Sequence, residues 1–150
     1  MNILKKELFN SCVVFVKRRE DTVQQIIRSN KNSLASETKS SAGDKHETGR
    51  AMLQLEMEKA SQQLAGLNEM KLVLNRINLN ESLKNVKLGS LVMTTQGNYF
   101  LSVSAGKITY LGKIYYAISL GSPIGKLLLG KAEGSNLDLN GKSFKIIEIY

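Results

Sequence analysis

The first third of the chain has the hydrophobic spacing of one long amphipathic helix. Residues 3 to about 38 contain no Gly or Pro. Apolar residues recur there at intervals close to three and four, namely Phe9, Val13, Val16, Val23, Ile27 and Leu34. Glu20 and Asn30 fill the remaining positions of the stripe. A polar residue in such a seam lowers stability but can fix the register of a coiled coil.

A second helical arm follows a short polar break at residues 40 to 47. Residues 47 to 78 repeat the heptad spacing through Leu53, Met57, Ala60, Leu64, Leu67 and Leu74. Two arms of similar length favour an antiparallel hairpin, because each arm then covers the apolar stripe of the other. An arm of about 35 residues is roughly 50 Å long. We therefore expect the break to form a projecting tip.

The hydrophobic period changes to two beyond residue 80, which predicts strands. Gly121 to Lys131 interrupts them, with Ser122 as a helix cap, Pro123 at the first helical position and Gly130 at the end. Asn140-Gly141 is typical of a type I′ turn. The expected strands cover residues 89–95, 99–104, 107–111, 113–120, 136–139 and 142–150. The fold class is therefore α+β, with a helical hairpin at 1–80 and an antiparallel sheet with one short helix at 81–150.

Composition and charge are those of a folded protein with an acidic partner. The 150 residues are 42% hydrophobic with one Pro, and 21 Lys and Arg against 13 Asp and Glu give a net charge of +8. Nucleic acid, a membrane surface or an acidic protein cleft are all compatible with this charge. Residues 41 to 80, which contain the expected tip, hold five charges of each sign. The tip region is thus neutral.

A single cysteine, Cys12, argues for a reducing, cytoplasmic compartment, since it has no partner for an internal disulfide. We expect it to be a small buried apolar residue. Asn10 and Ser11 interrupt the apolar run from Leu8 to Val16, which argues against a signal peptide. No run approaches the roughly 20 apolar residues of a membrane-spanning helix.

Two carboxylates in the break, Asp44 and Glu47, are the clearest candidates for chemistry. Three residues apart, they fit a capping box, in which Asp44 caps the second helix and Glu47 bonds back to it. A carboxylate can cap a helix and still face solvent at a tip, so capping does not exclude a further role for the pair. His46 has no partner for a zinc site.

Two motifs together resemble the Gre family of bacterial transcript-cleavage factors. The tip of that family reads Gly-Asp-x-x-Glu, which Gly43, Asp44 and Glu47 match. Its second signature is Ser-Pro, a short apolar helix and Gly-Lys, matched by Ser122-Pro123 and Gly130-Lys131 and followed by Glu133-Gly134. The resemblance covers nearly the whole chain.

The resemblance implies an FKBP-like C-terminal domain that binds the rim of the RNA polymerase secondary channel, with the hairpin passing down the channel. It implies partner contacts through Ser122, Pro123, Ile124, Lys126 and Lys131. Asp44 and Glu47 would help to hold an Mg²⁺ shared with the polymerase, close to backtracked RNA, with no tightly bound cofactor. The expected protein is a monomeric accessory factor of the cytoplasm, and neither an enzyme nor a membrane protein.

The chain departs from the family pattern at the tip, which keeps alternatives open. Lys45 and His46 replace the common Leu-Ser, and Arg50-Ala51 stands where an acidic and an aromatic residue usually follow. A cation beside metal ligands weakens an ion site. The intact pair of Asp44 and Glu47 favours a factor that stimulates cleavage of backtracked transcripts by RNA polymerase, which is the function we expect. The departures favour the alternative, a channel-binding modulator or inhibitor without cleavage activity. A prolyl isomerase is disfavoured by the absence of Trp and the presence of only four Phe, and direct nucleic-acid binding would be unspecific.

Overall fold

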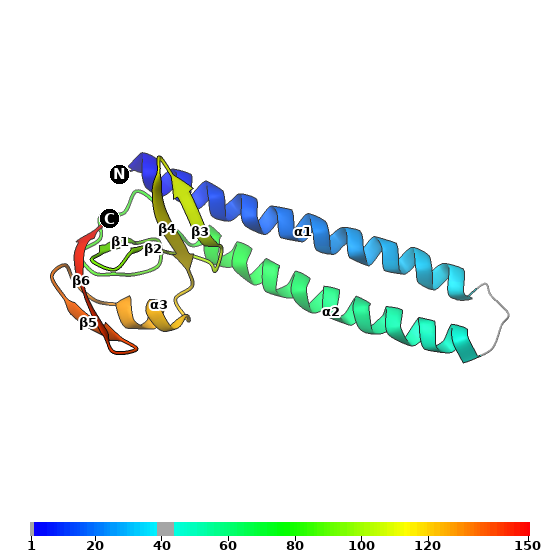
Figure 1. Ribbon diagram of the computed structural model, residues 1–150. Coiled ribbons are helices and arrows are strands. Elements are labelled where there is room, and N and C mark those ends of the chain that lie inside the picture. The colour runs from blue at the N-terminus through cyan, green and yellow to red at the C-terminus, as the bar shows by residue number, and fades with distance from the viewer. Residues whose placement is uncertain (1, 39–43) are drawn as a thin grey trace. The chain divides into compact units, whose positions relative to one another are not determined.

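The computed structural model describes residues 2–38 and 44–150. They form two compact units, one of residues 16–70 and one that joins residues 1–15 to residues 71–150. Helices α1 (Asn2–Thr38) and α2 (Asp44–Asn75) form the predicted hairpin, shown in blue and green in Figure 1. The sheet unit thus includes the ends of both helices, a grouping that the change of period near residue 80 does not show.

The apolar seam of the hairpin follows the predicted heptad positions in the unit of residues 16–70. Val23 of α1 and Ala60 and Leu67 of α2 are buried there. The prediction is wrong nearer the N-terminus, because Val13 is 41% exposed whereas Leu8 and Cys12 are fully buried. The reason is that this part of α1 belongs to the sheet unit and buries a different face.

The C-terminal half is one six-stranded sheet with the order β3-β4-β2-β1-β6-β5. The strands and the short helix lie where the change of period predicts them. They are β1 (Leu91–Thr94), β2 (Asn98–Leu101), β3 (Gly106–Tyr110), β4 (Lys113–Ile118), α3 (Pro123–Leu128), β5 (Asn136–Leu139) and β6 (Lys142–Ile149). A long helical hairpin followed by a mostly antiparallel sheet with one short helix confirms the expected fold class.

One strand pair differs from the fully antiparallel sheet that we expected. β2 and β4 are parallel, with Tyr99 opposite Tyr116 and Leu101 opposite Ile118. The chain leaves β2, crosses to the edge as β3 and returns as β4 through the β3–β4 hairpin. Two consecutive reversals bring β4 back into the direction of β2. Alternation along the sequence specifies strands but not this placement.

The turn between β5 and β6 has the predicted type I′ geometry. Asn140 and Gly141 have φ values of 52° and 78°, and the type requires positive φ at both central residues. Asparagine and glycine tolerate this region better than other residues. The β3–β4 turn has the same pair of signs, with φ of 48° at Leu111 and 78° at Gly112.

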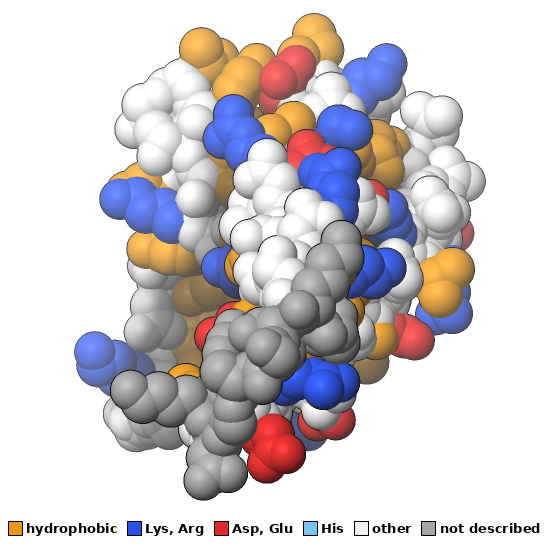
Figure 2. Space-filling model, turned by 90° about the vertical axis from the view of Figure 1, so that its right-hand side faces the viewer, with side chains coloured by type: hydrophobic (Ala, Val, Ile, Leu, Met, Phe, Trp, Pro, Cys, Tyr) orange, Lys and Arg blue, Asp and Glu red, His pale blue; other side chains and the backbone are white. Residues whose placement is uncertain are grey.

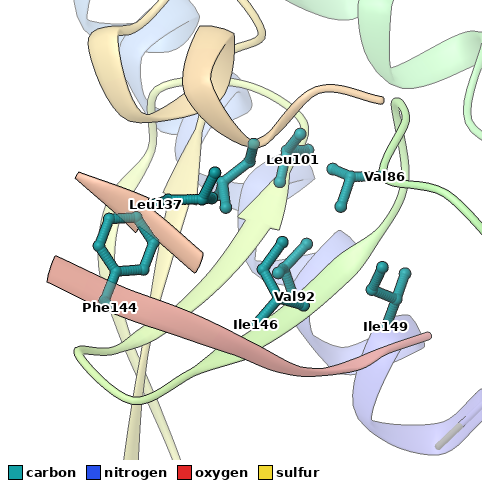
Figure 3. Packing of buried hydrophobic residues seen from close by; sticks show 8 residues of the cluster. Val86, Val92, Leu101, Leu137, Phe144, Ile146 and Ile149 are labelled. Carbon is teal, nitrogen blue, oxygen red and sulfur yellow. The ribbon is translucent and has the colours of Figure 1, made fainter. Parts of the chain in front are cut away.

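The hydrophobic core of the sheet unit lies between one face of the sheet and α3. Figure 3 shows residues of this core cluster, among them Val92, Leu101 and Ile146 from three neighbouring strands. Ile124 and Leu127 of α3 pack against this cluster, and Leu128 is part of it. Leu127 and Leu128 therefore face the sheet. The remaining buried members are Val86, Leu137, Phe144 and Ile149.

The N-terminal turns of α1 bring a cysteine against the end of β2. Cys12 is buried, and its Sγ lies 3.5 Å from the hydroxyl oxygen of Ser102, which is buried too. Burial raises the pKa of the Cys12 thiol, and the hydrogen bond with Ser102 opposes this rise only in part. A thiol that stays protonated is a poor nucleophile. Cys12 therefore has the structural role expected from the sequence.

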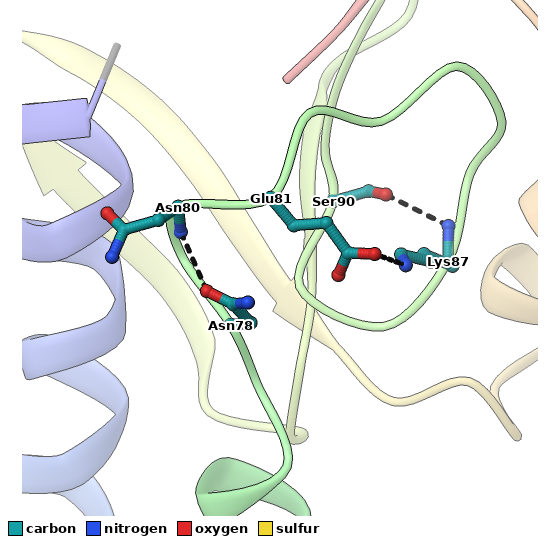
Figure 4. Close-up of polar contacts among 5 residues, drawn as sticks. All are labelled: Asn78, Asn80, Glu81, Lys87 and Ser90. Carbon is teal, nitrogen blue, oxygen red and sulfur yellow. Dashed lines mark hydrogen bonds and ion pairs between the residues drawn. The ribbon is translucent and has the colours of Figure 1, made fainter.

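The connection between α2 and β1 is held by local polar contacts (Figure 4). Lys87 forms an ion pair with Glu81, and its backbone N–H donates to Ser90 Oγ at 2.9 Å. Asn78 Oδ1 accepts from the backbone N–H of Asn80 at 3.1 Å. Glu81 also interacts electrostatically with Lys5 of α1, a side chain that is only 2% exposed.

We predict that Lys5→Met stabilises the protein at neutral pH by roughly 1 kcal/mol, because burial penalises the ammonium while a methionine keeps the apolar stem. Burial lowers the pKa of Lys5 in the folded state, although Glu81 partly opposes it. Between that lowered pKa and the ordinary lysine value the unfolded chain binds more protons, so Lys5 makes stability rise with pH in this window.

Urea unfolding of the wild type and the variant from neutral to alkaline pH would measure both effects. The difference in stability between the two should shrink as pH rises through the window. Lys6→Met is the matched control, since Lys6 is exposed and should change stability by less than about 0.5 kcal/mol. Equal effects at the two positions would show that the burial of Lys5 carries no penalty.

Candidate functional site

The two predicted tip carboxylates lie in the first turn of α2. Asp44 is the first residue of this helix, and Glu47, three residues later, is exposed. Residues 39–43, which include most of the predicted break, lie outside the described part, as do the side chains of Asp44, Lys45 and His46. Figure 2 shows the molecule turned by 90° from Figure 1, with both acidic and basic side chains on the face toward the viewer.

Position at a helix start favours carboxylates for two physical reasons. The first turn exposes unpaired backbone N–H groups, which a carboxylate can accept from. The helix dipole also stabilises negative charge there. The backbone positions of Asp44 and Glu47 are therefore compatible with the capping box. The proposed capping bond itself involves the side chain of Asp44, outside the described atoms.

An Mg²⁺ ion would find oxygen ligands at Asp44 and Glu47. Among the residues whose side chains the structure describes, no three or more His, Cys, Asp or Glu gather into a group that could hold a metal ion. Mg²⁺ commonly binds through one or two carboxylates and takes its other ligands from water or phosphate. The residues present thus fit an ion that is shared with a partner.

The second predicted site, around α3, is built by a capped helix start. The Ser122 hydroxyl accepts from the backbone N–H of Gly125 at 3.0 Å and donates to the carbonyl oxygen of Ser119 at 2.7 Å. Pro123 occupies the first helical turn, where its missing N–H costs nothing. The sequence prediction of this cap is confirmed. Ser122 thereby holds the start of α3 against the preceding loop.

The side chains of this segment divide between core and solvent. Ile124 is half-buried and packs against the hydrophobic core. Pro123, Lys126 and Lys131 are exposed. Of the five predicted partner-binding residues, these three therefore present accessible surface, while Ser122 and Ile124 mainly position the helix.

Strand-like pairing fixes the end of the α3 segment. Val86 donates its N–H to the carbonyl of Lys131 at 2.8 Å, and its own carbonyl accepts from Gly130 at 2.8 Å. Asn85 Nδ2 adds a bond to the Gly130 carbonyl at 2.9 Å. Both ends of α3 are thus anchored, which the Ser-Pro and Gly-Lys signature alone did not indicate.

The structure also contains a groove on the hairpin that sequence analysis missed. It measures about 600 Å³ and lies between α1 and α2. Asn30, which is buried, donates from Nδ2 to Glu56 Oε2 at 3.2 Å within it. Most of the lining residues have polar side chains. They are Thr22, Gln25, Ile26, Ser29, Asn30, Glu56, Lys59, Ala60 and Gln63. The seam position of Asn30 was the only sequence signal for this feature.

No protein-family model and no curated protein sequence matches this chain. A search of solved structures finds similarity to a chain described as the transcription factor Gfh1, with 21% identity over 88% of this chain and 93% of that chain. The TM-score is 0.35. At this value we assign no residue from that structure. No helix in the described ranges is long and apolar enough to cross a membrane.

We predict that Gly125→Ala disrupts α3. A Cβ at this position would lie 2.1 Å from the carbonyl oxygen of Ser119 and 2.8 Å from Ser122 Oγ, so the cap must open to admit it. The expected loss in unfolding free energy is about 2 kcal/mol or more. Urea denaturation followed by circular dichroism would measure it.

Gly121→Ala is the control, because a Cβ at this position meets no atom within 4 Å. Its effect should stay within about 0.5 kcal/mol. A Gly125→Ala variant as stable as Gly121→Ala would contradict the described packing of α3.

Proposed function

We propose that this protein is a Gre-like factor that binds RNA polymerase in its secondary channel and stimulates cleavage of backtracked transcripts. The observation that carries the proposal is the placement of Asp44 and Glu47 in the first turn of a 32-residue helix. The Gly-Asp-x-x-Glu motif of the resemblance falls at that point. The α3 segment, which carries the second motif, supports the proposal.

The length of the hairpin suits a narrow channel. Helix α1 has 37 residues and α2 has 32, which correspond to lengths of about 55 Å and 48 Å. Helices pack into a rod only about two helix diameters wide. A hairpin of this kind can carry two carboxylates to a site that a globular domain cannot enter.

Asp44 and Glu47 would act by donating oxygen ligands to an Mg²⁺ ion at the polymerase active site. When bound, this ion supplies charge stabilisation and an activated water for phosphodiester hydrolysis. The role of this chain is to place two negative charges at the polymerase active site, so that this Mg²⁺ ion binds more tightly. The reaction itself belongs to the polymerase, and the protein is an accessory factor.

Docking would depend on the surface of α3. Pro123, Lys126 and Lys131 are exposed and lie on a segment anchored at both ends, so the backbone of this segment loses little conformational freedom on binding. Two lysines favour an acidic surface on the partner. Ser122 and Ile124 would contribute by holding this surface in shape.

A second candidate function is a channel-binding modulator without cleavage activity. The observation that favours it is the set of cations around the tip, Lys45 and Arg50, together with His46. A positive charge close to the carboxylates competes with Mg²⁺ for their field. In this alternative, the hairpin occupies the channel and alters polymerase activity by obstruction.

We predict that the double variant Asp44→Asn, Glu47→Gln abolishes stimulated cleavage and leaves polymerase binding unchanged. Asparagine caps helices as well as aspartate, so this pair removes the charge while it preserves the helix start. Transcript shortening in stalled, backtracked complexes at a fixed Mg²⁺ concentration would measure the effect. Cleavage by the variant at the wild-type rate would exclude a metal-binding role for both side chains.

The pair Lys45→Leu, His46→Ser tests the alternative function in the same assay. Restoring the residues common in the family should increase the cleavage rate if the cation weakens the ion site. If neither the wild type nor this variant shortens the transcript although both bind polymerase, the modulator function is the correct one.

We also predict that Lys126→Ala together with Lys131→Ala weakens polymerase binding by roughly fivefold or more without unfolding the protein, since exposed lysines contribute to docking but not to the core. Titration with labelled polymerase would give the dissociation constant. Lys142→Ala, another exposed lysine, serves as the control. Equal affinities for all variants would remove α3 from the docking surface.

A further inference from the structure

The turn between β3 and β4 holds an apolar side chain that folding does not explain. Leu111 is 84% exposed and has a φ of +48°. A positive φ is uncommon for residues other than glycine, and bulky side chains are disfavoured there. The exposed position gains almost nothing from burial. Leucine at residue 111 therefore has two costs: a strained backbone conformation and an apolar side chain exposed to water.

The same sheet contains a turn with the same geometry and a suitable residue. Asn140 has a φ of 52° before Gly141 at 78°, against 48° for Leu111 before Gly112 at 78°. Asn-Gly is the preferred pair for this type I′ geometry. The β5–β6 turn thus reaches the same backbone geometry with asparagine, so the geometry does not require leucine. Backbone strain that the fold does not require is characteristic of functional positions.

Two further exposed apolar side chains lie on β4, the strand that follows this turn. Ile114 and Tyr116 are 41% and 40% exposed, and they share a face because alternate residues of a strand do. Register places Lys107 of β3 opposite Tyr116. We call Lys107, Leu111, Ile114 and Tyr116 the β3–β4 patch. All four residues belong to the sheet unit.

The charge of the segment that carries this patch is of one sign. Residues 82 to 132 contain six lysines and no Asp or Glu. Every one of these lysines is exposed, and Lys87 pairs with Glu81 just outside the segment. The six are Lys84, Lys87, Lys107, Lys113, Lys126 and Lys131. An apolar patch in a basic surface complements an apolar pocket with an acidic rim.

We propose that the β3–β4 patch is a protein-interaction surface that inserts Leu111 into an apolar, acid-rimmed pocket of the partner. The identity of the partner as RNA polymerase rests on the proposed function. The contact would be additional to that of the α3 segment. Tyr116 is the one aromatic residue of the patch, whereas Leu111 and Ile114 offer no stacking surface for bases. Single-stranded nucleic acid is usually bound by several aromatic side chains on which successive bases stack, so a protein pocket fits the patch better than RNA.

The variant Leu111→Asn separates binding from folding, because the two should change in opposite directions. Asparagine suits the positive φ, so the melting temperature should rise by about 2 °C or more. Removal of the apolar side chain should weaken polymerase binding by roughly fivefold or more. The matched control is Asn140→Leu, which places the same strained leucine in the other turn. It should lower the melting temperature and leave binding unchanged.

The experiment uses the full chain with purified RNA polymerase of the same organism, in a fluorescence titration, and with single-stranded RNA in a parallel titration. Weaker polymerase binding by Leu111→Asn, with an unchanged affinity for Asn140→Leu, supports the proposal. If Leu111→Asn binds polymerase with wild-type affinity, the β3–β4 patch is not an interaction surface, while the proposed function stands. No binding of the wild type to polymerase overturns both. Loss of RNA binding alone on Leu111→Asn would assign the patch to nucleic acid and also overturn the proposal.

Discussion

Burial of the central strands on both faces is the constraint on which the sheet unit depends. Leu91 and Val92 of β1, and Phe100 and Leu101 of β2, are all fully buried. Neighbouring residues of a strand point to opposite faces, so each face must be covered. Val92 and Leu101 meet the cluster that includes Leu128 of α3. On the other side of the strands, Ser102 follows Phe100 in alternation and meets Cys12 of α1.

This constraint links segments that are far apart in the sequence. Cys12 and Ser102 are separated by 90 residues, and the β2–β4 pairing needs β3 to cross to the edge first. Because α3 covers one face, its outward side chains are presented by a helix that cannot move without exposing Leu128. The proposed docking surface is therefore rigid for the same reason that the sheet is stable. The strained turn at Leu111 sits on that same framework.

Local sequence signals predicted the elements well and their spatial partners less well. The heptad stripes gave both arms of the hairpin, and Ser122-Pro123 and Asn140-Gly141 gave a helix start and a turn, because each depends on residues close in sequence. Val13 was assigned to the seam wrongly because periodicity cannot tell which surface a helix buries. The parallel β2–β4 pair, the buried Lys5 and the Asn30–Glu56 groove all depend on long-range packing, which no local pattern specifies.

The candidate sites show the same division. The cap at Ser122 was predictable because it lies within one turn of helix, whereas the anchoring of Gly130 and Lys131 by residues 85 and 86 was not. The strain at Leu111 had no sequence signal, since Leu-Gly is not a preferred turn pair. Asp44 and Glu47 were found through a motif rather than through their environment.

The most direct test is the Mg²⁺ dependence of transcript cleavage by stalled, backtracked RNA polymerase with and without the wild-type protein. If Asp44 and Glu47 donate ligands to a shared Mg²⁺ ion, the protein should lower the Mg²⁺ concentration needed for half-maximal cleavage. The reason is that the added carboxylates increase the affinity of the site for that ion. An identical Mg²⁺ dependence and cleavage rate with and without saturating protein would contradict the proposed function of the hairpin.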